Sequence, residues 1–477
     1  MSTAASPKQA VEPKKISYIG ASQWLISLAI PMLIFMMAPF DYTMLAYLAI
    51  TVGAILFWVF ALIPEPITGL LIPILFCLVG VSKPETAFKA WSSIMPWLVL
   101  AGMIMGEVML NTGLAKRIAY RLLLVAGCSG TGLLVSCLLL SVLLPLIIPA
   151  AVWAKMLVLA PVGIAICHAL GFKAQSREAT GIMLMLLFTS LSSGYQYITG
   201  DETMIWVASM ISDVTKGQVV LNFVEWMKVM WLPGFVWVAM SIIIPYFLLV
   251  RPSTKNAPDS THIIKEKYQE LGPIQGIEVK AMTIIMLILL NFFFEERHGL
   301  NSAHVMVILT SLFFLPGINL MDFEKLKQMN IWIIFFVAGA LTIGQTSNAI
   351  GFNDIVAKNL LPAMQGAGSY GAVLIFYTFG VFVKFFMTPL AAIAAFTPLV
   401  GDVAIQLGVS PVAAMQIYNF SVDMYLFPYE VAPVLYFFSL GYMSYKESIK
   451  IFCWRLLASY CIVAIIISGY WKMIGLI

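Results

Sequence analysis

The chain has 477 residues, of which 61% are hydrophobic and 10% are charged, and its formal net charge is +4. Soluble domains carry about 25% charged residues, so this composition excludes an ordinary soluble protein. The modest net charge gives no reason to expect a nucleic-acid partner. The six cysteines form no CxxC pair and the four histidines are scattered, so we expect no metal site. No GxxxxGK[ST] motif for binding nucleoside triphosphates is present.

Apolar stretches that can cross a bilayer recur along the whole chain. In chain order they cover 24–40, 43–62, 66–82, 94–112, 130–148, 152–170, 180–198, 230–250, 279–295, 302–318, 330–347, 370–387, 389–408, 411–441 and 455–475. Several are short or interrupted by Pro and Gly, which predicts roughly 10–13 full crossings and some re-entrant hairpins. The predicted fold class is an all-α polytopic membrane protein.

The distribution of charge predicts how the chain is divided. Lysines at positions 8, 14 and 15 precede the first apolar stretch and predict a cytoplasmic N-terminus. The only long polar stretch predicts a cytoplasmic linker between two transmembrane halves. The tail, the first helix with the first repeat, the linker and the second repeat are predicted over 1–22, 23–250, 251–280 and 281–477. No cleavable signal peptide is expected.

A weak internal repeat relates the two halves at a spacing of 237 positions. The matched residues are Gly80 with Gly317, Pro161 with Pro398, and Leu170-Gly171 with Leu407-Gly408. Two similar membrane halves with interrupted apolar segments indicate a secondary transporter, whose solute lies near the membrane midplane between the repeats.

In the first half, polar chemistry gathers at two interruptions. Pro145 and Pro149 cannot both stand in one straight helix, so we expect an unwound stretch there, with Lys155 beside it to hold an anion. The alternative for Lys155 is a side chain that reaches the headgroups from a helix end. The second interruption, 189–203, is either a binding segment or a loop at the membrane surface. Its candidate residues are Ser192, Ser193, Thr199, Gly200, Asp201 and Glu202.

The second half has two comparable segments. Lys384 is followed by Thr388 and Pro389, close to where the repeat spacing carries the first break. Its alternative is a cationic helix end at the headgroups. The other segment runs from 419 to 433, and its candidates are Asn419, Ser421, Tyr429 and Glu430. There the alternative is a structural kink with Glu430 at the surface.

Four short motifs, in this order, resemble those of the divalent anion:sodium symporters, which carry dicarboxylates, citrate or sulfate. Leu62-Ile-Pro-Glu-Pro-Ile-Thr68 is similar to the family's LPxPxT, and Gly113-Leu-Ala-Lys-Arg-Ile-Ala119 to its GLxxRIA. Ser190-Leu-Ser-Ser193 with Thr199-Gly200 resembles its SLSS…TG segment. The set Pro428-Tyr429, Pro433 and Gly441-Tyr442 resembles the closing PYxxxP…GY pattern of its citrate and dicarboxylate branch.

The resemblance implies two inverted repeats, each with a re-entrant hairpin and a broken helix, in a homodimer of the cytoplasmic membrane. It implies substrate and Na⁺ sites at Ser-Asn-Thr motifs on the hairpin tips. This chain departs there, with Ala150-Ala151-Val152 at the first tip and Met387-Thr388-Pro389 at the second. Ala150 and Ala151 are therefore included in the predicted site, because they occupy the position of the first motif.

Asp201, Glu202 and Glu430 stand where relatives have small or hydroxyl residues, and we treat them as candidates for the coupling ion. One hypothesis is that Lys155 or Lys384 pairs with one of these acids, and that a proton replaces Na⁺.

We predict a secondary carrier of small organic anions, coupled to Na⁺, H⁺ or a counter-anion, with membrane lipid around it. The alternatives are a carrier of another solute, such as one bearing an amine, and an intramembrane enzyme or non-transporting protein. No catalytic dyad or metal triad supports an enzyme.

Overall fold

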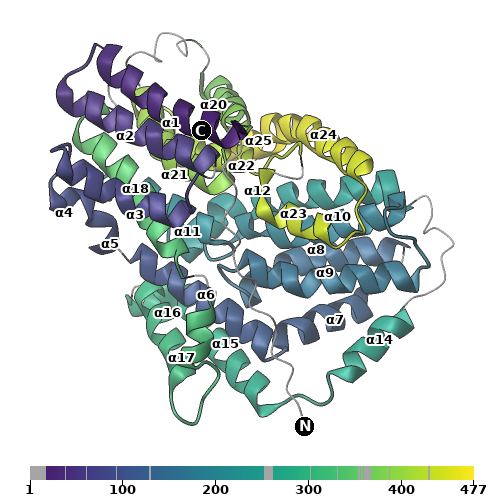
Figure 1. Cartoon of the computed structure of the whole chain (residues 1–477). Helices are drawn as coiled ribbons and strands as arrows, with labels where there is room; N and C mark the ends of the chain where they lie inside the picture. Colours follow the sequence, from purple (N-terminus) through teal and green to yellow (C-terminus); the bar gives the residue numbers. More distant parts are fainter. Residues whose placement is uncertain are drawn as a thin grey trace.

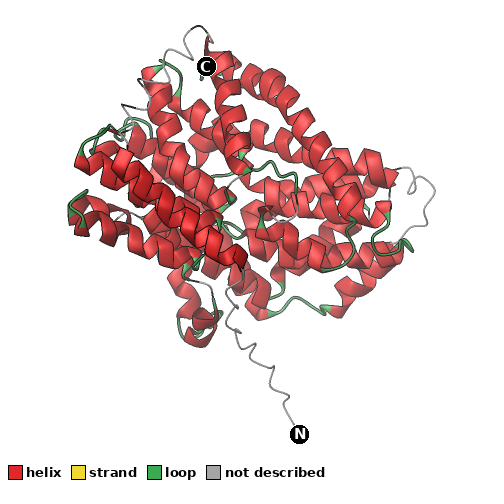
Figure 2. Ribbon diagram, turned by 45° about the horizontal axis from the view of Figure 1, so that its top comes forward, coloured by secondary structure: helices red, strands yellow, loops and turns green. Residues whose placement is uncertain are grey.

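The computed structural model describes residues 18–37, 39–60, 62–92, 94–127, 130–251, 261–300, 302–329, 331–352, 355, 358, 366, 368–385, 387–427 and 430–477. Within these ranges every regular element is helical (Figure 2). The predicted site residue Tyr429 and most of the N-terminal tail lie outside the described residues.

The helices of the first half range in length from 4 residues to 23 residues. They are α1 (Tyr18–Met37), α2 (Tyr42–Val59), α3 (Glu65–Leu78), α4 (Pro84–Ala87), α5 (Lys89–Ser92), α6 (Met95–Asn111), α7 (Leu114–Ala126), α8 (Gly130–Ile147), α9 (Val152–Ala169), α10 (Arg177–Leu191), η1 (Ser192–Gln196), α11 (Glu202–Val214), α12 (Phe223–Pro245) and η2 (Tyr246–Val250).

The remaining elements follow the polar linker, part of which is itself helical. They are α14 (Thr261–Glu270), α15 (Gly276–His298), α16 (Ser302–Ser311), η3 (Leu312–Phe314), α17 (Phe323–Gln328), α18 (Ile333–Ala349), α20 (Gly368–Lys384), α21 (Pro389–Gln406), α22 (Pro411–Ser421), α23 (Ala432–Ser439), α24 (Tyr445–Cys461), η5 (Ile462–Ile467) and α25 (Ser468–Met473).

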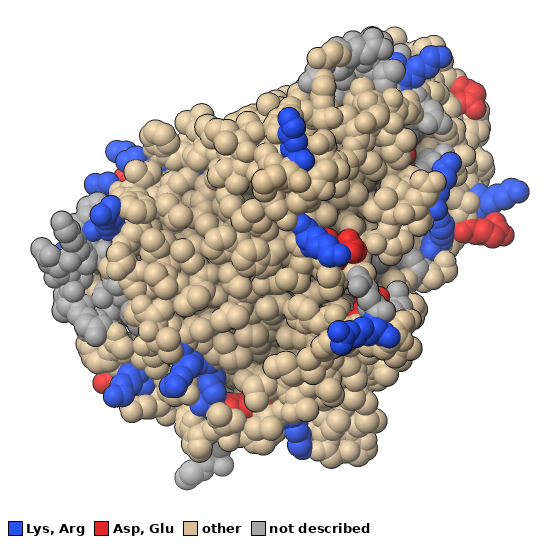
Figure 3. All heavy atoms as spheres, turned by 180° about the vertical axis from the view of Figure 1, so that it is seen from behind, with Lys and Arg blue, Asp and Glu red and all other residues tan. Residues whose placement is uncertain are grey.

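The described part contains eight helices long and apolar enough to cross a membrane, or nine if α6 and α7, bent by 67°, form one span, which is fewer than the crossings predicted from the sequence. Four shorter apolar helices accompany them. Figure 3 shows a face on which charged side chains are sparse, with a broad uncharged area between those at its edges and the few near its middle. This distribution is expected for a surface that meets lipid. The structure is thus an all-α polytopic membrane protein, as predicted.

Breaks in helices fall where proline and glycine predict them. α8 ends at Ile147, before Pro149, and α9 begins at Val152, so an unwound stretch separates the two helices. α20 and α21 form the corresponding pair in the second half, separated at 385–388. The stretches predicted over 180–198 and 411–441 are likewise interrupted, at η1 and after Ser421. Figure 1 shows α8, α9 and α10 stacked on one side of the molecule and α1 to α3 on the other.

The residues matched by the internal repeat have matching conformations. Gly171 and Gly408 follow α9 and α21 with φ of 69° and 68°, and Gly80 and Gly317 have φ of 73° and 90°. Positive φ is readily available to glycine because it has no Cβ. Pro161 and Pro398 stand inside α9 and α21. These matches agree with two related halves, whereas the inverted orientation and the domain boundaries stay predictions.

Candidate functional site

The two predicted segments of the first half lie in contact. Ala150, between α8 and α9, has φ of 49° and donates its N–H to the carbonyl of Thr199 at 2.6 Å. Lys155 is fully buried in the first turn of α9, and its Nζ donates to the carbonyl of Gly200 at 2.8 Å. Lys155 therefore reaches into the protein toward unwound backbone instead of toward the headgroups.

The unwound backbone between α10 and α11 depends on two glycines that contact each other. A Cβ on Gly200 would lie 2.2 Å from the carbonyl oxygen of Gly194, and a Cβ on Gly194 would lie 2.7 Å from the Cβ of Asp201. Asp201 then begins α11 as its N-cap, because its Oδ1 accepts the N–H of Thr203 at 2.9 Å. Such caps stabilise a helix start by about 1 kcal/mol.

Gly200→Ala is expected to lower the thermal stability of the purified protein and to reduce its activity at least tenfold. The added methyl group would displace backbone, and overpacking of this kind costs roughly 1–3 kcal/mol. Gly469→Ala is the matched control, since a Cβ there meets nothing within 4 Å. Thermal unfolding in detergent measures both variants, and equal behaviour of the two would contradict the prediction.

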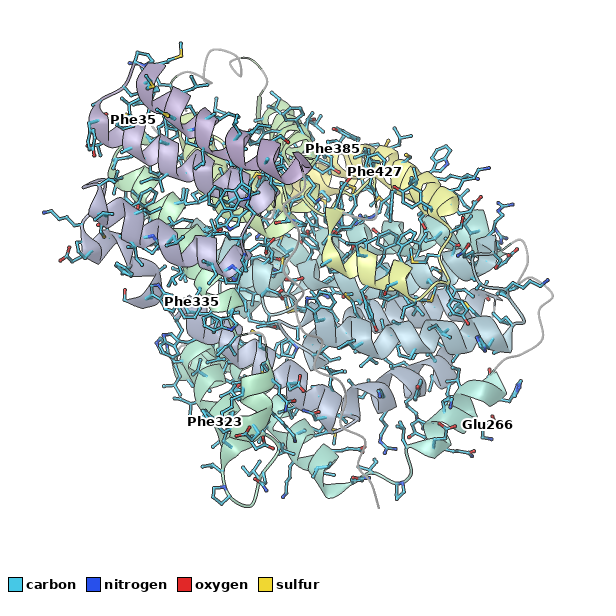
Figure 4. The ribbon with its side chains drawn as sticks, in the orientation of Figure 1. Phe35, Glu266, Phe323, Phe335, Phe385 and Phe427 are labelled. Atoms are coloured by element: carbon cyan, nitrogen blue, oxygen red, sulfur yellow. The ribbon has the colours of Figure 1, made fainter. Side chains whose placement is uncertain are left out.

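The second half places a lysine in a similar position. Lys384, in the last turn of α20, is 1% exposed, and its Nζ lies 3.4 Å from both the carbonyl oxygen and the Oε2 of Glu430. Oε1 of Glu430 accepts the N–H of Phe427 at 3.1 Å. Figure 4 shows the labelled Phe385 and Phe427 in the same upper central region, where these segments meet. The predicted pairing of Lys384 with Glu430 is thus formed.

These segments enclose a cavity of about 480 Å³, a size typical of small-molecule sites. Five helices begin at its wall, namely α3, α9, α11, α21 and α23. The lining residues at those helix starts are Glu65, Val152, Trp153, Glu202, Thr203, Pro389, Leu390, Ala432 and Pro433. The N-terminus of a helix carries about half a positive charge and unpaired N–H groups. The cavity is therefore surrounded by groups that favour negative charge.

Five carboxylates also line this cavity: Glu65, Asp201, Glu202, Asp423 and Glu430. Asp201 caps α11, Glu430 pairs with Lys384, and Asp423 pairs with Arg455. Three of the five acids are thus engaged by the protein itself. Among the described residues the Glu65 carboxylate has no partner, and Glu202 has one buried oxygen, Oε2, without a partner.

Asp423 is fixed by a buried network that joins three helices. Its Oδ2 accepts Ser192 Oγ at 2.9 Å and Trp237 Nε1 at 2.8 Å, and it also pairs with the guanidinium of Arg455. Arg455, on α24, donates from Nε to Ser241 Oγ at 2.7 Å and from Nη2 to Ser192 Oγ at 3.0 Å. The guanidinium also lies 4.6 Å from the ring centroid of Phe188, which adds a cation–π contact.

The predicted site residues fall into distinct groups. Asp201, Glu202, Thr388, Pro389 and Glu430 line the cavity, while Ala150 and Ala151 line a neighbouring one. Those behind the cavity wall or away from it are Lys155, Ser192, Ser193, Thr199, Gly200, Asn419 and Ser421.

Sequence reasoning missed Arg455, Trp237 and Glu65 as parts of the site. A lone arginine inside an apolar stretch is itself a signal, because a charge at the centre of a membrane helix usually has a functional partner. Glu65 stood in a quoted motif without an assigned role. Nothing in the sequence around Trp237 distinguishes it from the other tryptophans.

Long apolar helices, breaks in those helices and a cavity beside the breaks are the features of a multi-span membrane transporter. The transmembrane region of sodium:sulfate symporters, as a protein family, matches residues 20–477. The chain belongs to that family, and its members are transporters, not enzymes.

Several characterised proteins are similar to this chain at low identity. The inner membrane protein YbhI of Escherichia coli K12 is 26% identical, over 79% of this chain and 81% of its own length. The sodium-dependent dicarboxylate transporter SdcS of Staphylococcus aureus is 23% identical, over 88% of this chain and 84% of its own. The chloroplastic dicarboxylate transporter 1 of Spinacia oleracea is 24% identical over 70% of this chain, and the match spans 60% of that protein's length.

Proposed function

We propose that the protein is a secondary carrier of small organic anions, of the di- or tricarboxylate class, that works by alternating access. The observation that carries this proposal is the convergence of five helix N-termini on one cavity. Their N–H groups and dipoles bind carboxylates in the way that helix N-termini bind phosphate. The names of the spinach and staphylococcal relatives support the same substrate class.

We propose further that Na⁺ is not required, because two lysines supply the charge that a bound cation would bring. Lys155 Nζ contacts the carbonyl oxygen of Gly200, the residue before Asp201, which is the N-cap of α11. In the same way, Lys384 Nζ contacts the carbonyl oxygen of Glu430, the residue before Val431, which is the N-cap of α23. A carbonyl exposed at a helix break is a typical ligand for a coupling cation. An ammonium group fixed there leaves a cation no vacant ligand.

The charges around the cavity favour protons as the coupling ion. Lys155, Lys384 and Arg455, together with five helix starts worth about half a charge each, roughly balance the five carboxylates. A dicarboxylate would bring two further negative charges. Protons on Glu65, whose carboxylate has no partner among the described residues, and on Glu202, whose Oε2 has none, would offset them. The solute and the protons would then move together, in a cytoplasmic membrane and in the dimer that the family resemblance implies.

Uptake of radiolabelled succinate and citrate into proteoliposomes tests the proposal. We expect uptake to be driven by an inward proton gradient and by internal dicarboxylate, and to be unchanged when Na⁺ is replaced by choline. The ionophore nigericin, which collapses the pH gradient in K⁺ buffer, should remove the first kind of uptake and leave the second.

A strict requirement for Na⁺ would contradict the proposed role of the lysines. The absence of uptake from folded protein would instead favour a solute that carries an amine, since Glu65 and Glu202 can pair with an ammonium group. Competition by aspartate and glutamate, which carry both groups, distinguishes these solutes. A carrier of simple dicarboxylates should be inhibited more strongly by succinate than by aspartate.

A further inference from the structure

A second cavity lies next to the central one and shares part of its wall. It has a volume of about 400 Å³ and lies between α6, the start of α9 and the end of α17, where Gln328 and Met329 stand. Val152, Trp153 and Glu202 line both cavities. Glu202 is thus the one carboxylate that borders both of these spaces.

The chemistry of the second cavity differs from that of the central one. Its polar side chains are Glu107, Glu202 and Gln328, and the others are apolar or small. Oε1 of Glu107 accepts a hydrogen bond from Asn111 Nδ2 at 2.9 Å. A wall of this kind leaves the polar groups of an organic anion unpaired, which is costly. A space of this size still admits several water molecules, whose partners would be the two carboxylates and the backbone.

The partly exposed side chain of Glu202 lines this space, which places its carboxyl group where it can exchange a proton with water there. Its Oε2 is buried without a hydrogen-bond partner. The charged groups that face it are Lys155 from α9, its neighbour Asp201, Glu107 across the second cavity and Glu65 across the central one. Because most of these groups are acidic, a proton on Glu202 relieves repulsion between carboxylates.

We propose that the second cavity is a proton route, by which a proton passes from water beside Glu107 to the Glu202 carboxylate without entering the solute cavity. No other bond is made or broken. The inference rests on the proton coupling proposed above. Separate routes would let Glu202 gain or lose its proton while the solute stays enclosed.

Filling the second cavity tests this route. Met103, on α6, lines it, whereas Leu100 on the same helix does not. In proteoliposomes, a trapped pH-sensitive dye reports proton entry, and exchange of labelled against unlabelled dicarboxylate at equal pH reports solute movement. During exchange the carrier crosses back with solute and protons still bound, so exchange does not require that protons be released. Met103→Trp should lower proton entry at least tenfold and leave exchange within twofold, while Leu100→Trp changes neither.

Glu107→Gln should also lower proton entry, by a smaller factor than Met103→Trp. If Met103→Trp fails to fold, Leu110→Phe fills the second cavity with a smaller side chain. An equal loss of exchange and proton entry, or unchanged proton entry in the filled variants, overturns the route. Wild-type protein that exchanges dicarboxylate without any proton entry overturns proton coupling itself, and the route with it, while anion transport stands.

Discussion

Replacing Arg455 by alanine is expected to abolish transport and to lower the thermal stability of the protein. The side chain is 1% exposed and holds Asp423, Ser192 and Ser241 in one network. Removing one partner of a buried ion pair costs about 3–5 kcal/mol, because the other charge stays buried and uncompensated. Thermal unfolding in detergent and dicarboxylate exchange in proteoliposomes measure the two effects.

Two further variants separate positioning from stability. Lys327→Ala removes a lysine whose pair with Glu324, at 2.7 Å, is exposed on both sides, and it should change the free energy of unfolding by under about 1 kcal/mol. Arg455→Met combined with Asp423→Asn removes both charges and should restore much of the stability. We expect this double variant to fold without transporting, since Asp423 lines the cavity. Full transport by the double variant would show that the network serves stability alone.

The sequence predicted the spans and the breaks because both depend on local chemistry. Apolar runs set the long helices, and Pro149 and Pro389 mark the places where a helix ends or starts. The polar helices α7 and α14 were not predicted as elements, since α7 carries three cationic residues and α14 lies in the polar linker. Arg117 of α7 pairs with Glu278 of α15 at 2.8 Å, which only the fold brings together.

The segments around the cavity were predictable from the sequence, but their contacts were not. Paired prolines and runs of hydroxyl residues marked stretches that border the cavity, yet Ser192 meets Arg455 across 263 positions of sequence. Nor could the sequence show that Lys155 contacts a backbone carbonyl, whereas Lys384 contacts both a backbone carbonyl and a carboxylate. The direction of a long side chain depends on which helix packs against it, and local pattern carries no such information.

Replacing Lys155 by serine is expected to eliminate transport in the absence of Na⁺ and to make the residual transport depend on Na⁺. The change removes the ammonium group from the carbonyl oxygen of Gly200, and an unpaired buried carbonyl costs roughly 1–3 kcal/mol. A small cation that binds there would satisfy the carbonyl and restore the lost positive charge.

Titration of Na⁺ against dicarboxylate uptake, with choline as the balancing cation, measures the effect of Lys155→Ser. Lys228→Ala is the control, because that lysine is 61% exposed and pairs with Glu225 on the same helix. Lys155→Arg keeps the charge and should remain independent of Na⁺ even if it is slower. Should Lys155→Ser fold and transport normally without Na⁺, the lysine would have no part in charge compensation. Should it fold and stay inactive at every Na⁺ concentration, the ammonium group would be needed for more than its charge, as a direct ligand of the anion in another state of the cycle.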